Sequence, residues 1–388
     1  MPTDVMLYAS IGPQLTHYEV DVDDASLRRR ATVTLPANVH YVWPHASRQY
    51  LYVASSNSAS GIGGIVGDKH HVSALRIDPA NGALMPHGTP IALPTRPIHM
   101  TSDVPSRNLL VAFSNPSGLK VYRVNPDFTP GAEVAQTEAI DPGIYGHQVR
   151  VGLDNRLAIL VTRGHDAAAG KPEEPGALKV FRYEDGLLTG EVSVAPGGGY
   201  GFGPRHLDFH PAKPWVYVSL ERQNRLDMFA IDGDRLSPTP LFSKGTLAEP
   251  GNIHGRQAAG TIHVHPNGRF VYVANRASST VGEGAQRVFA GGENTLAVYA
   301  IDPATGEPDP IQHVDTRGIH CRTFHIDPSG RLLVAAHITG LPVKEGGAIR
   351  IVPACLSLFR IGADGKLDFV RKYDVDVGDQ QMFWMGMV

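Results

Sequence analysis

Polar residues able to do chemistry recur at two corresponding places in repeated stretches of this sequence. One place is the start of an apolar stretch, which carries His99, His147, Arg205, His263 and Arg322. The other is the end of the next apolar stretch, which carries Asn57, Asn115, Arg163, Glu221, Arg276 and His337. Arginines hold carboxylates or phosphates bidentately and polarise carbonyl groups. With a carboxylate and histidines, they make a set suited to an anionic or carbonyl ligand.

The elements that must position these residues repeat along the chain. Each copy has an apolar strand ending in His-Pro or Asp-Pro, a turn, a second apolar strand, and an alternating strand ending near Ile-Asp. The fullest copies begin at His206, Ile262 and Thr323, and weaker copies begin near Tyr41, Ile98 and Gln148. We name the strands of a unit a, b, c and d in chain order. Four short antiparallel strands in a period of about 45–60 residues predict an all-β fold, the β-propeller.

The number of blades follows from the second strands, which begin near residues 6, 51, 109, 157, 215, 270 and 332. They predict seven four-stranded blades in a single domain spanning residues 1–388. The first blade has candidates for strands b and c, at residues 6–10 and 15–20, but no strand a. The C-terminal run 381–388 has no strand b after it. We therefore expect the C-terminal strand to join the N-terminal blade and close the ring.

Antiparallel pairing decides which face of the disc carries the candidates. Strand a lines the channel of a propeller, so the start of a and the end of b lie on one face. Both sets of candidates therefore converge on one funnel. The b–c insertions fall on the same face and are expected to wall it: residues 56–71, 164–176, 277–293 and 338–353.

The remaining polar positions are predicted to be structural. The a–b turns lie on the opposite face, where short polar side chains can bond the turn backbone. We expect this role for His45, His210 and His265, with Asp327 in the same place of the last copy. Cys321 and Cys355 fall in strands a and c of one blade, separated by strand b, so we expect buried thiols and no disulfide.

Composition excludes several classes of protein. The 388 residues hold 42 glycines and 30 prolines, which fits many short strands and turns. A net charge of −3 offers no basic field for nucleic acid, and no apolar run reaches membrane-spanning length. Residues 1–12 lack a basic and an apolar region typical of a secretory signal, which predicts a cytoplasmic location. Because closed propellers need no partner for stability, we expect a monomer.

The residues resemble one known family, the seven-bladed propeller lactonases. The similarity covers nearly all of the chain and is most specific between residues 203 and 336. It is carried by GPRHLDFHP at 203–211 with Glu221, by HVHPNGRF at 263–270 with Asn275-Arg276, and by CRTFHID at 321–327. Members include 6-phosphogluconolactonases and carboxymuconate lactonizing enzymes. By position, the resemblance implies His147, Arg205, Glu221 and Arg276 as the catalytic set, with Arg322 as a further anion ligand.

The resemblance leaves three functions open. The first is hydrolysis of a sugar-acid or phosphosugar lactone, with Glu221 as general base, His147 as proton shuttle and the arginines binding the anion. The second is lactonization of a carboxylated muconate. The third is a binding scaffold without catalysis, although the Trp-Asp signature of WD repeats is absent. We predict a small anionic lactone or carboxylate as partner, no cofactor and no metal, with substrate contacts from Arg322, Arg163, His337 and His263.

Overall fold

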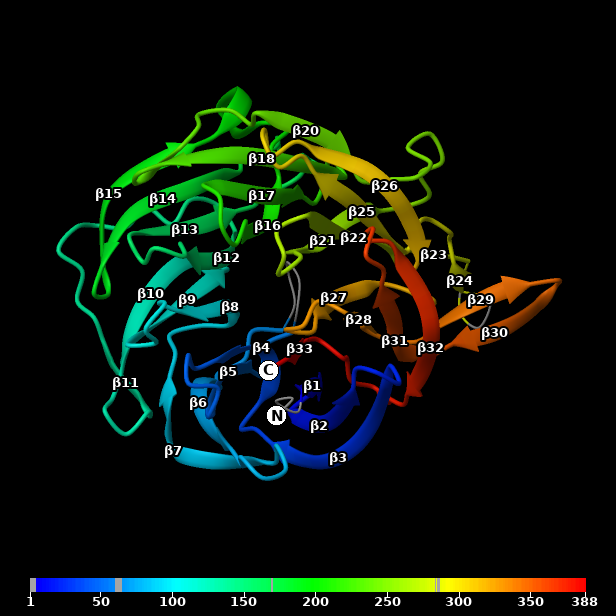
Figure 1. The fold of residues 1–388 in the computed structure, drawn as a ribbon, viewed down its shortest axis with the longest axis horizontal. Helices are drawn as coiled ribbons and strands as arrows, with labels where there is room; N and C mark the ends of the chain where they lie inside the picture. Colours follow the sequence, from blue (N-terminus) through cyan, green and yellow to red (C-terminus); the bar gives the residue numbers. More distant parts are fainter. Residues whose placement is uncertain (1–4, 60–64, 169, 283, 285–286) are drawn as a thin grey trace.

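The computed structural model describes residues 5–59, 65–168, 170–282, 284 and 287–388. Its strands form seven antiparallel sheets arranged as blades around a common axis (Figure 1). This confirms the predicted seven-bladed propeller. The described residues include a short helical turn, η1 (Pro196–Gly199), and no helix among them is long and apolar enough to cross a membrane.

The first four blades contain four strands each. Blade 1 contains β33 (Met385–Met387), β1 (Val5–Ile11), β2 (Gln14–Asp21) and β3 (Ser26–Thr34). Blade 2 contains β4 (Asn38–Pro44), β5 (Tyr50–Ser56), β6 (His70–Ile77) and β7 (Leu84–Ala92). Blade 3 contains β8 (Pro97–Ser102), β9 (Asn108–Ser114), β10 (Ser117–Val124) and β11 (Pro130–Glu133). Blade 4 contains β12 (Gly146–Val151), β13 (Leu157–Thr162), β14 (Ala177–Glu184) and β15 (Leu187–Val194).

The last three blades carry additional short strands. Blade 5 contains β16 (Pro204–Phe209), β17 (Trp215–Leu220), β18 (Arg225–Asp232) and β20 (Phe242–Gly245), with β19 (Arg235–Leu236) also on β18. Blade 6 contains β21 (Gln257–Val264), β22 (Phe270–Ala277), β25 (Thr295–Ile301) and β26 (Pro308–Asp315). Blade 7 contains β27 (Cys321–Ile326), β28 (Leu332–His337), β31 (Ala354–Ile361) and β32 (Leu367–Val375). Two hairpins stand apart: β23 (Thr280–Val281) with β24 (Val288–Phe289), and β29 (Leu341–Glu345) with β30 (Ala348–Val352).

The two ends of the chain complete blade 1 together. Strand β33 pairs antiparallel with β1, with Met387 opposite Leu7 and Met385 opposite Ala9. A backbone hydrogen bond from Ser10 N to Trp384 O (2.9 Å) extends this pairing. The composite blade confirms the predicted ring closure, and β1 and β33 lie side by side in Figure 1.

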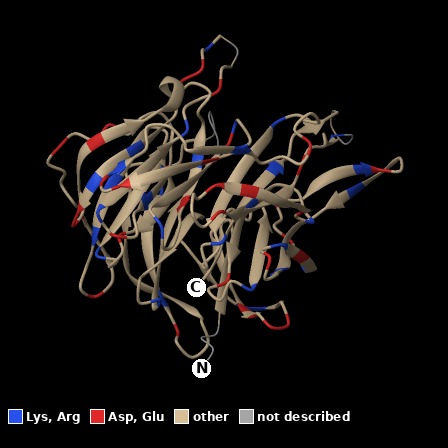
Figure 2. Cartoon of the chain, turned by 45° about the horizontal axis from the view of Figure 1, so that its top comes forward, with Lys and Arg blue, Asp and Glu red and all other residues tan. Residues whose placement is uncertain are grey.

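Apolar side chains fill the spaces between neighbouring blades. Ile159 and Val161 of blade 4, for example, pack in one cluster with Leu207, Val216 and Val218 of blade 5. Burial of such side chains is the main favourable contribution to stability, at roughly 25 cal/mol per Å² of apolar surface. Charged residues of both signs are interspersed in the view of Figure 2 and form no continuous basic face there.

The a–b turns on one face are built by the predicted histidines. The His210 ring accepts the Lys213 N–H at Nδ1 (2.9 Å), and Nε2 bonds the Gly268 carbonyl in the next blade (2.9 Å). His265 does the same with Asn267 N (3.1 Å) and Gly330 O (2.8 Å). Each ring therefore ties its own turn to that of the next blade.

Equivalent turns use other residues for the same purpose. Asp327 accepts the N–H groups of Arg331 and Leu332, both at 2.7 Å. His45 bonds Ser47 within its own turn. These contacts confirm the structural prediction for the four turn residues.

Candidate active site

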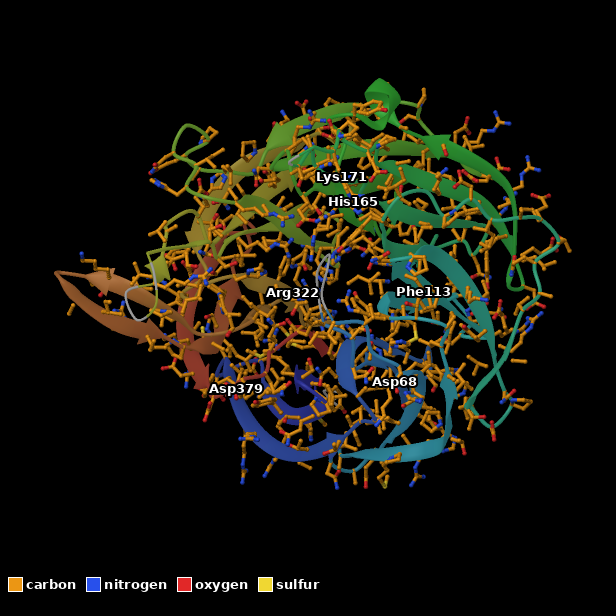
Figure 3. The ribbon with its side chains drawn as sticks, turned by 180° about the vertical axis from the view of Figure 1, so that it is seen from behind. Asp68, Phe113, His165, Lys171, Arg322 and Asp379 are labelled. Atoms are coloured by element: carbon orange, nitrogen blue, oxygen red, sulfur yellow. The ribbon has the colours of Figure 1, made fainter. Side chains whose placement is uncertain are left out.

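A cavity of about 450 Å³ opens on the opposite face, where the a strands begin and the b strands end. Among the described residues, six arginines contribute to its lining against a single carboxylate, that of Glu221. The arginines are Arg96, Arg163, Arg205, Arg256, Arg276 and Arg322. They come from blades 3 to 7, and Figure 3 places Arg322 near the axis of the ring. The lining has the charge and size expected for a small anionic ligand.

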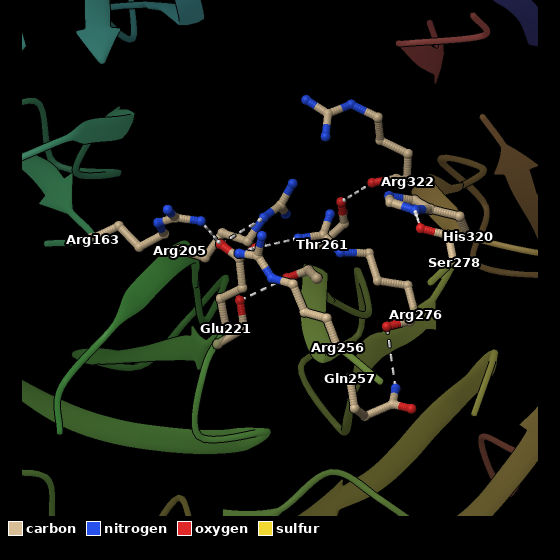
Figure 4. Close-up of polar contacts among 12 residues, drawn as sticks. Arg163, Arg205, Glu221, Arg256, Gln257, Thr261, Arg276, Ser278, His320 and Arg322 are labelled. Atoms are coloured by element: carbon tan, nitrogen blue, oxygen red, sulfur yellow. Dashed lines mark hydrogen bonds and ion pairs between the residues drawn. The ribbon is translucent and has the colours of Figure 1, made fainter. Parts of the chain in front are cut away.

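Glu221 is the centre of a buried ion cluster (Figure 4). Its Oε1 accepts from Arg276 Nη2 at 2.8 Å, and its Oε2 accepts from Arg163 Nη1 at 3.0 Å. Arg256 Nη2 lies 3.5 Å from Oε1 and Arg205 Nε lies 3.6 Å from Oε2. Four guanidinium groups thus share one carboxylate whose side chain is 6% exposed.

Irregularities in the a strands aim three of the side chains into the cavity. The register of β12 against β13 shifts between Gly146 and Gln148, which leaves His147 at the irregularity. Arg205 and Arg322 occupy the corresponding places in β16 and β27. A bulge re-aims the side chain of its extra residue, and such features are common beside active sites. The same irregularity in successive blades therefore directs polar groups to one point.

The ends of the b strands supply the partners. Glu221 N donates to Gly203 O (2.8 Å), and Arg163 N donates to Tyr145 O (3.0 Å), two residues before the irregularity in each blade. Arg276 lies opposite Ala258 in the corresponding part of blade 6. The strand pairing therefore brings Glu221, Arg163 and Arg276, at the ends of their b strands, to the same edge of the blades as the irregularities in the a strands.

Burial and neighbouring charges set the protonation of the cluster. Burial alone would raise the pKa of Glu221, but Arg276, Arg163 and Arg205 together hold that pKa well below 4.5. Burial, reinforced by Arg205, lowers the pKa of His147 well below 6.5. At neutral pH the site therefore holds an ionised carboxylate and an uncharged imidazole.

Several donors in the site have no partner. The buried atoms Arg163 Nε, Arg205 Nε, Arg205 Nη1 and Arg276 Nη1 make no hydrogen bond with any described residue. His147 Nδ1 is also buried and unpartnered. Buried polar groups are nearly always satisfied in folded proteins, and exceptions often mark functional sites.

Comparison with known proteins identifies the family to which the chain belongs. The sequence model for "Lactonase, 7-bladed beta-propeller" matches residues 7–340. The chain belongs to this lactonase family. A 6-phosphogluconolactonase of Bacillus subtilis (strain 168) is 26% identical over 356 residues, covering 88% of this chain and 90% of the relative. A 6-phosphogluconolactonase of Serratia proteamaculans (strain 568) is 26% identical over 378 residues, covering 96% of each.

Solved structures share the same propeller. The periplasmic gluconolactonase of Pseudomonas aeruginosa has a TM-score of 0.73 at 21% identity, covering 99% of each chain. A putative 6-phosphogluconolactonase from Bacteroides fragilis has a TM-score of 0.72 at 17% identity, covering 100% of this chain and 98% of that one. At these identities the likeness shows the fold.

The structure brings together all four residues that the family resemblance implied. His147, Arg205, Glu221 and Arg276 line one cavity, with Arg322 on its wall. Arg163, which the sequence placed among the substrate contacts, bonds Glu221 directly. In the β12–β13 turn of blade 4, Asn155 adopts the left-handed conformation with φ of 61°. Strand β12 carries the same irregularity at His147 that β16 carries at Arg205.

The prediction for His337 is wrong. The position equivalent to Glu221 is Ile338, whose N–H donates to His320 O (3.2 Å) and whose side chain lines the cavity. Successive side chains of a strand point to opposite faces. His337 therefore turns away and is fully buried, with Nδ1 3.1 Å from the Cys355 carbonyl.

His263 also lies outside the cavity, which corrects the second predicted contact. Strand β21 begins at Gln257, so His263 stands near its far end, toward the a–b turn. There its Nδ1 lies 3.6 Å from Asp208 Oδ2. The true start of this strand a is marked by Arg256, which the sequence reading missed.

Arg96 was missed for a related reason. It directly precedes β8, whereas the prediction placed His99 at the start of that strand. The signal was present, because Pro97-Ile98-His99 parallels Pro204-Arg205-His206. Aligning the two prolines puts Ile98, which lines the cavity, at the irregularity and Arg96 one residue before the strand.

Two of the four predicted insertions reach the cavity with described residues. Ser278 and Ser279 come from the β22–β25 insertion, and Thr339 and Leu341 come from the β28–β31 insertion. Their hairpins contact each other through β24 and β29. Residues 60–64, 169, 283 and 285–286 of these insertions lie outside the described residues.

Cys321 and Cys355 are buried free thiols, as predicted. Within the described ranges, histidine, cysteine, aspartate and glutamate nowhere gather in a group of three or more that would hold a metal ion.

Proposed function

We propose that this chain hydrolyses the lactone of a sugar acid, and that its first substrate candidate is a phosphorylated sugar lactone. Membership of the lactonase family and the names of the curated relatives support this activity. The observation that carries the proposal is the cluster of arginines around Glu221, in which Arg163, Arg205 and Arg276 are buried and keep N–H donors without a partner among the described residues. Such donors suit an oxygen that gains negative charge during the reaction.

Arg205 and Arg276 are the proposed ligands of the lactone carbonyl. Attack of water on this carbonyl forms a tetrahedral intermediate with charge on the former carbonyl oxygen. Nη1 of Arg205 and Nη1 of Arg276 make no hydrogen bond with a described residue, and the ion pairs with Glu221 hold both side chains in place. Stabilisation therefore requires little reorganisation of the protein when charge develops.

Glu221 is assigned a positioning role in place of the base role suggested by sequence. Its two oxygens already face four guanidinium groups, and its pKa is held well below the ordinary value. Because both oxygens already accept hydrogen bonds from arginines, this carboxylate is poorly placed to take a proton from water. Its negative charge instead keeps like-charged arginines at close distance.

His147 is the proposed general base. It lines the cavity and is uncharged at neutral pH because burial lowers its pKa. In this scheme the imidazole takes a proton from water as the C–O bond to the carbonyl carbon forms. The intermediate then collapses as the bond between the carbonyl carbon and the ring oxygen breaks. The ring oxygen keeps the electron pair of that bond and takes the proton from His147, so that an open-chain acid is released.

A substrate panel tests the proposed activity. Purified protein is assayed with 6-phosphogluconolactone, gluconolactone and a muconolactone, and acid release is followed by pH-stat titration. We expect hydrolysis of the phosphorylated lactone with the highest kcat/KM. Turnover of the muconolactone alone would instead identify the lactonizing reaction, and turnover of none would identify a binding scaffold.

The role of His147 has its own test. Because its pKa lies well below 6.5, kcat/KM should stay level from about pH 7.5 to below pH 6.5. The His147→Gln variant should lose about 10²- to 10⁴-fold in kcat. If the variant is still active and its kcat/KM falls at low pH in the same way as that of the wild-type protein, His147 is not the base.

A further inference from the structure

We propose that Arg96, Arg322 and Phe383 form a second subsite, which binds the terminal phosphate of the lactone while Arg205 and Arg276 hold its carbonyl. This inference rests on the proposed function and divides its cavity into two parts. All five residues line the same cavity, so one small molecule can contact both parts.

Arg322 lies flat against an aromatic ring. Its Cζ is 3.6 Å from the centroid of Phe383, and its Nε donates to the Phe383 carbonyl at 3.2 Å. A guanidinium stacked in this way keeps its orientation and presents its remaining donors in one plane. Among the described residues no carboxylate forms an ion pair with Arg322.

Arg96 approaches the same ring from blade 3. Its Cζ is 5.9 Å from the Phe383 centroid, and its Nη2 donates to His40 Nδ1 at 3.3 Å. The residue is 8% exposed, and its buried Nε has no partner among the described residues. His40 packs edge-on against Phe383 with centroids 4.9 Å apart, which completes the support of the ring.

The two parts of the cavity differ in charge balance. Around Glu221, one carboxylate offsets part of the charge of four guanidinium groups. Beside Phe383 lie two guanidinium groups, and the imidazole that Arg96 contacts is that of His40, whose pKa burial lowers well below 6.5. Burial, with Arg276 and Arg96 nearby, lowers the pKa of Arg322 to about 9. A buried positive charge without a counter-ion is costly, and a bound dianion would relieve that cost.

Phosphate fits this second part better than a neutral sugar hydroxyl would. Planar guanidinium groups bind phosphate oxygens through paired hydrogen bonds. Binding at a position remote from the reacting carbon would orient the lactone over Arg205 and His147. The subsite would therefore determine whether phosphorylated or unphosphorylated lactones are preferred.

Two substrates that differ by one phosphate test the subsite. We expect Arg96→Gln and Arg322→Gln each to raise KM for 6-phosphogluconolactone by about 10- to 100-fold. The ratio of kcat/KM for this lactone over gluconolactone should fall by a similar factor. Equal losses on both lactones would overturn the subsite, because they would indicate a general role in the cavity.

Matched variants separate the subsite from unspecific effects. Arg256→Gln, on the Glu221 side, should lower kcat/KM for both lactones together. Arg182→Gln removes an exposed guanidinium outside the cavity that pairs with Asp234, and should change neither. Arg96→Lys keeps the charge and tests whether the planar group matters, with circular dichroism as the check that each variant folds.

Inorganic phosphate gives a readout that is independent of turnover. Calorimetric titration of the wild-type protein should detect binding, and Arg96→Gln and Arg322→Gln should each weaken it by about tenfold or more. If the wild-type protein hydrolyses neither lactone but shows this dependence, the proposed function fails and the subsite stands. Phosphate binding that both variants leave unchanged overturns the subsite.

Discussion

The two faces of the disc use the same types of polar residue in opposite ways. On the turn face, both ring nitrogens of His210 and of His265 have backbone partners. On the cavity face, one buried nitrogen of His147 and two of Arg205 have no partner among the described residues. The turn histidines thus bond their own chain, whereas these cavity groups keep hydrogen-bonding capacity that a ligand could use.

This difference separates stability from function within one repeating architecture. A satisfied buried hydrogen bond contributes about 1 kcal/mol, while an unsatisfied polar group costs about 1–3 kcal/mol. Polar groups that are kept despite such a cost are candidates for binding and catalysis. The comparison therefore predicts that variants on the two faces fail in different ways.

The largest effect is expected from Glu221→Gln. Without its charge, four guanidinium groups face one another and move apart, so kcat/KM should fall at least about 100-fold. Breaking a buried ion cluster should also lower the free energy of unfolding by about 3 kcal/mol. Lactone hydrolysis and urea denaturation measure the two quantities.

Glu345→Gln is the matched control, because Glu345 pairs with Arg350 in the exposed β29–β30 hairpin. It should leave both measurements unchanged. Full activity of Glu221→Gln would contradict the assignment of function to the cavity face and of stability to the turn face.

His265→Ala should show the opposite behaviour. It removes the bond to Gly330 and the cap of its own turn, so the free energy of unfolding should fall by about 1–3 kcal/mol. The kcat/KM per folded molecule should not change, since the ring lies on the face away from the cavity. A loss of activity at temperatures where the variant is folded would show that the faces are coupled.

A smaller effect concerns the pH dependence of stability. Burial lowers the pKa of His147 in the folded protein, so below pH 6.5 the unfolded chain binds a proton that the folded one does not. Stability is therefore lost as pH falls, at up to about 1.4 kcal/mol per pH unit for one such histidine. His147→Gln should flatten the decline of Tm between about pH 6.5 and 5. Parallel curves for the two proteins would contradict the buried neutral state.

The repeat pattern was sufficient to predict the fold. Alternating apolar residues and turn signals located seven b strands, and the unpaired run ending in Met385–Met387 predicted the closure on β1. Arg205, Glu221 and Arg276, which the sequence predicted to meet, line the cavity, because each falls at a strand end that the pattern defines clearly.

The errors have a common physical origin in strand register. An irregularity inserts a residue without changing the apolar pattern, so Arg96 and Arg256 were not recognised as strand starts. A shift of one residue reverses the direction of a side chain, which exchanged His337 for Ile338. The protonation of Glu221 and His147 was likewise beyond the sequence, because it depends on arginines from other blades.

The closure of the ring would influence how the proposed phosphate subsite binds and releases its ligand. Phe383 immediately precedes the segment that bonds Ser10 and the β33–β1 pairing. The pairing that joins the two chain ends and the proposed phosphate subsite at Phe383 are therefore directly connected along the chain. Transient opening of the β33–β1 pairing would move the Phe383 ring away from Arg96 and Arg322. A ligand bound at the subsite would in turn protect this pairing from proteases.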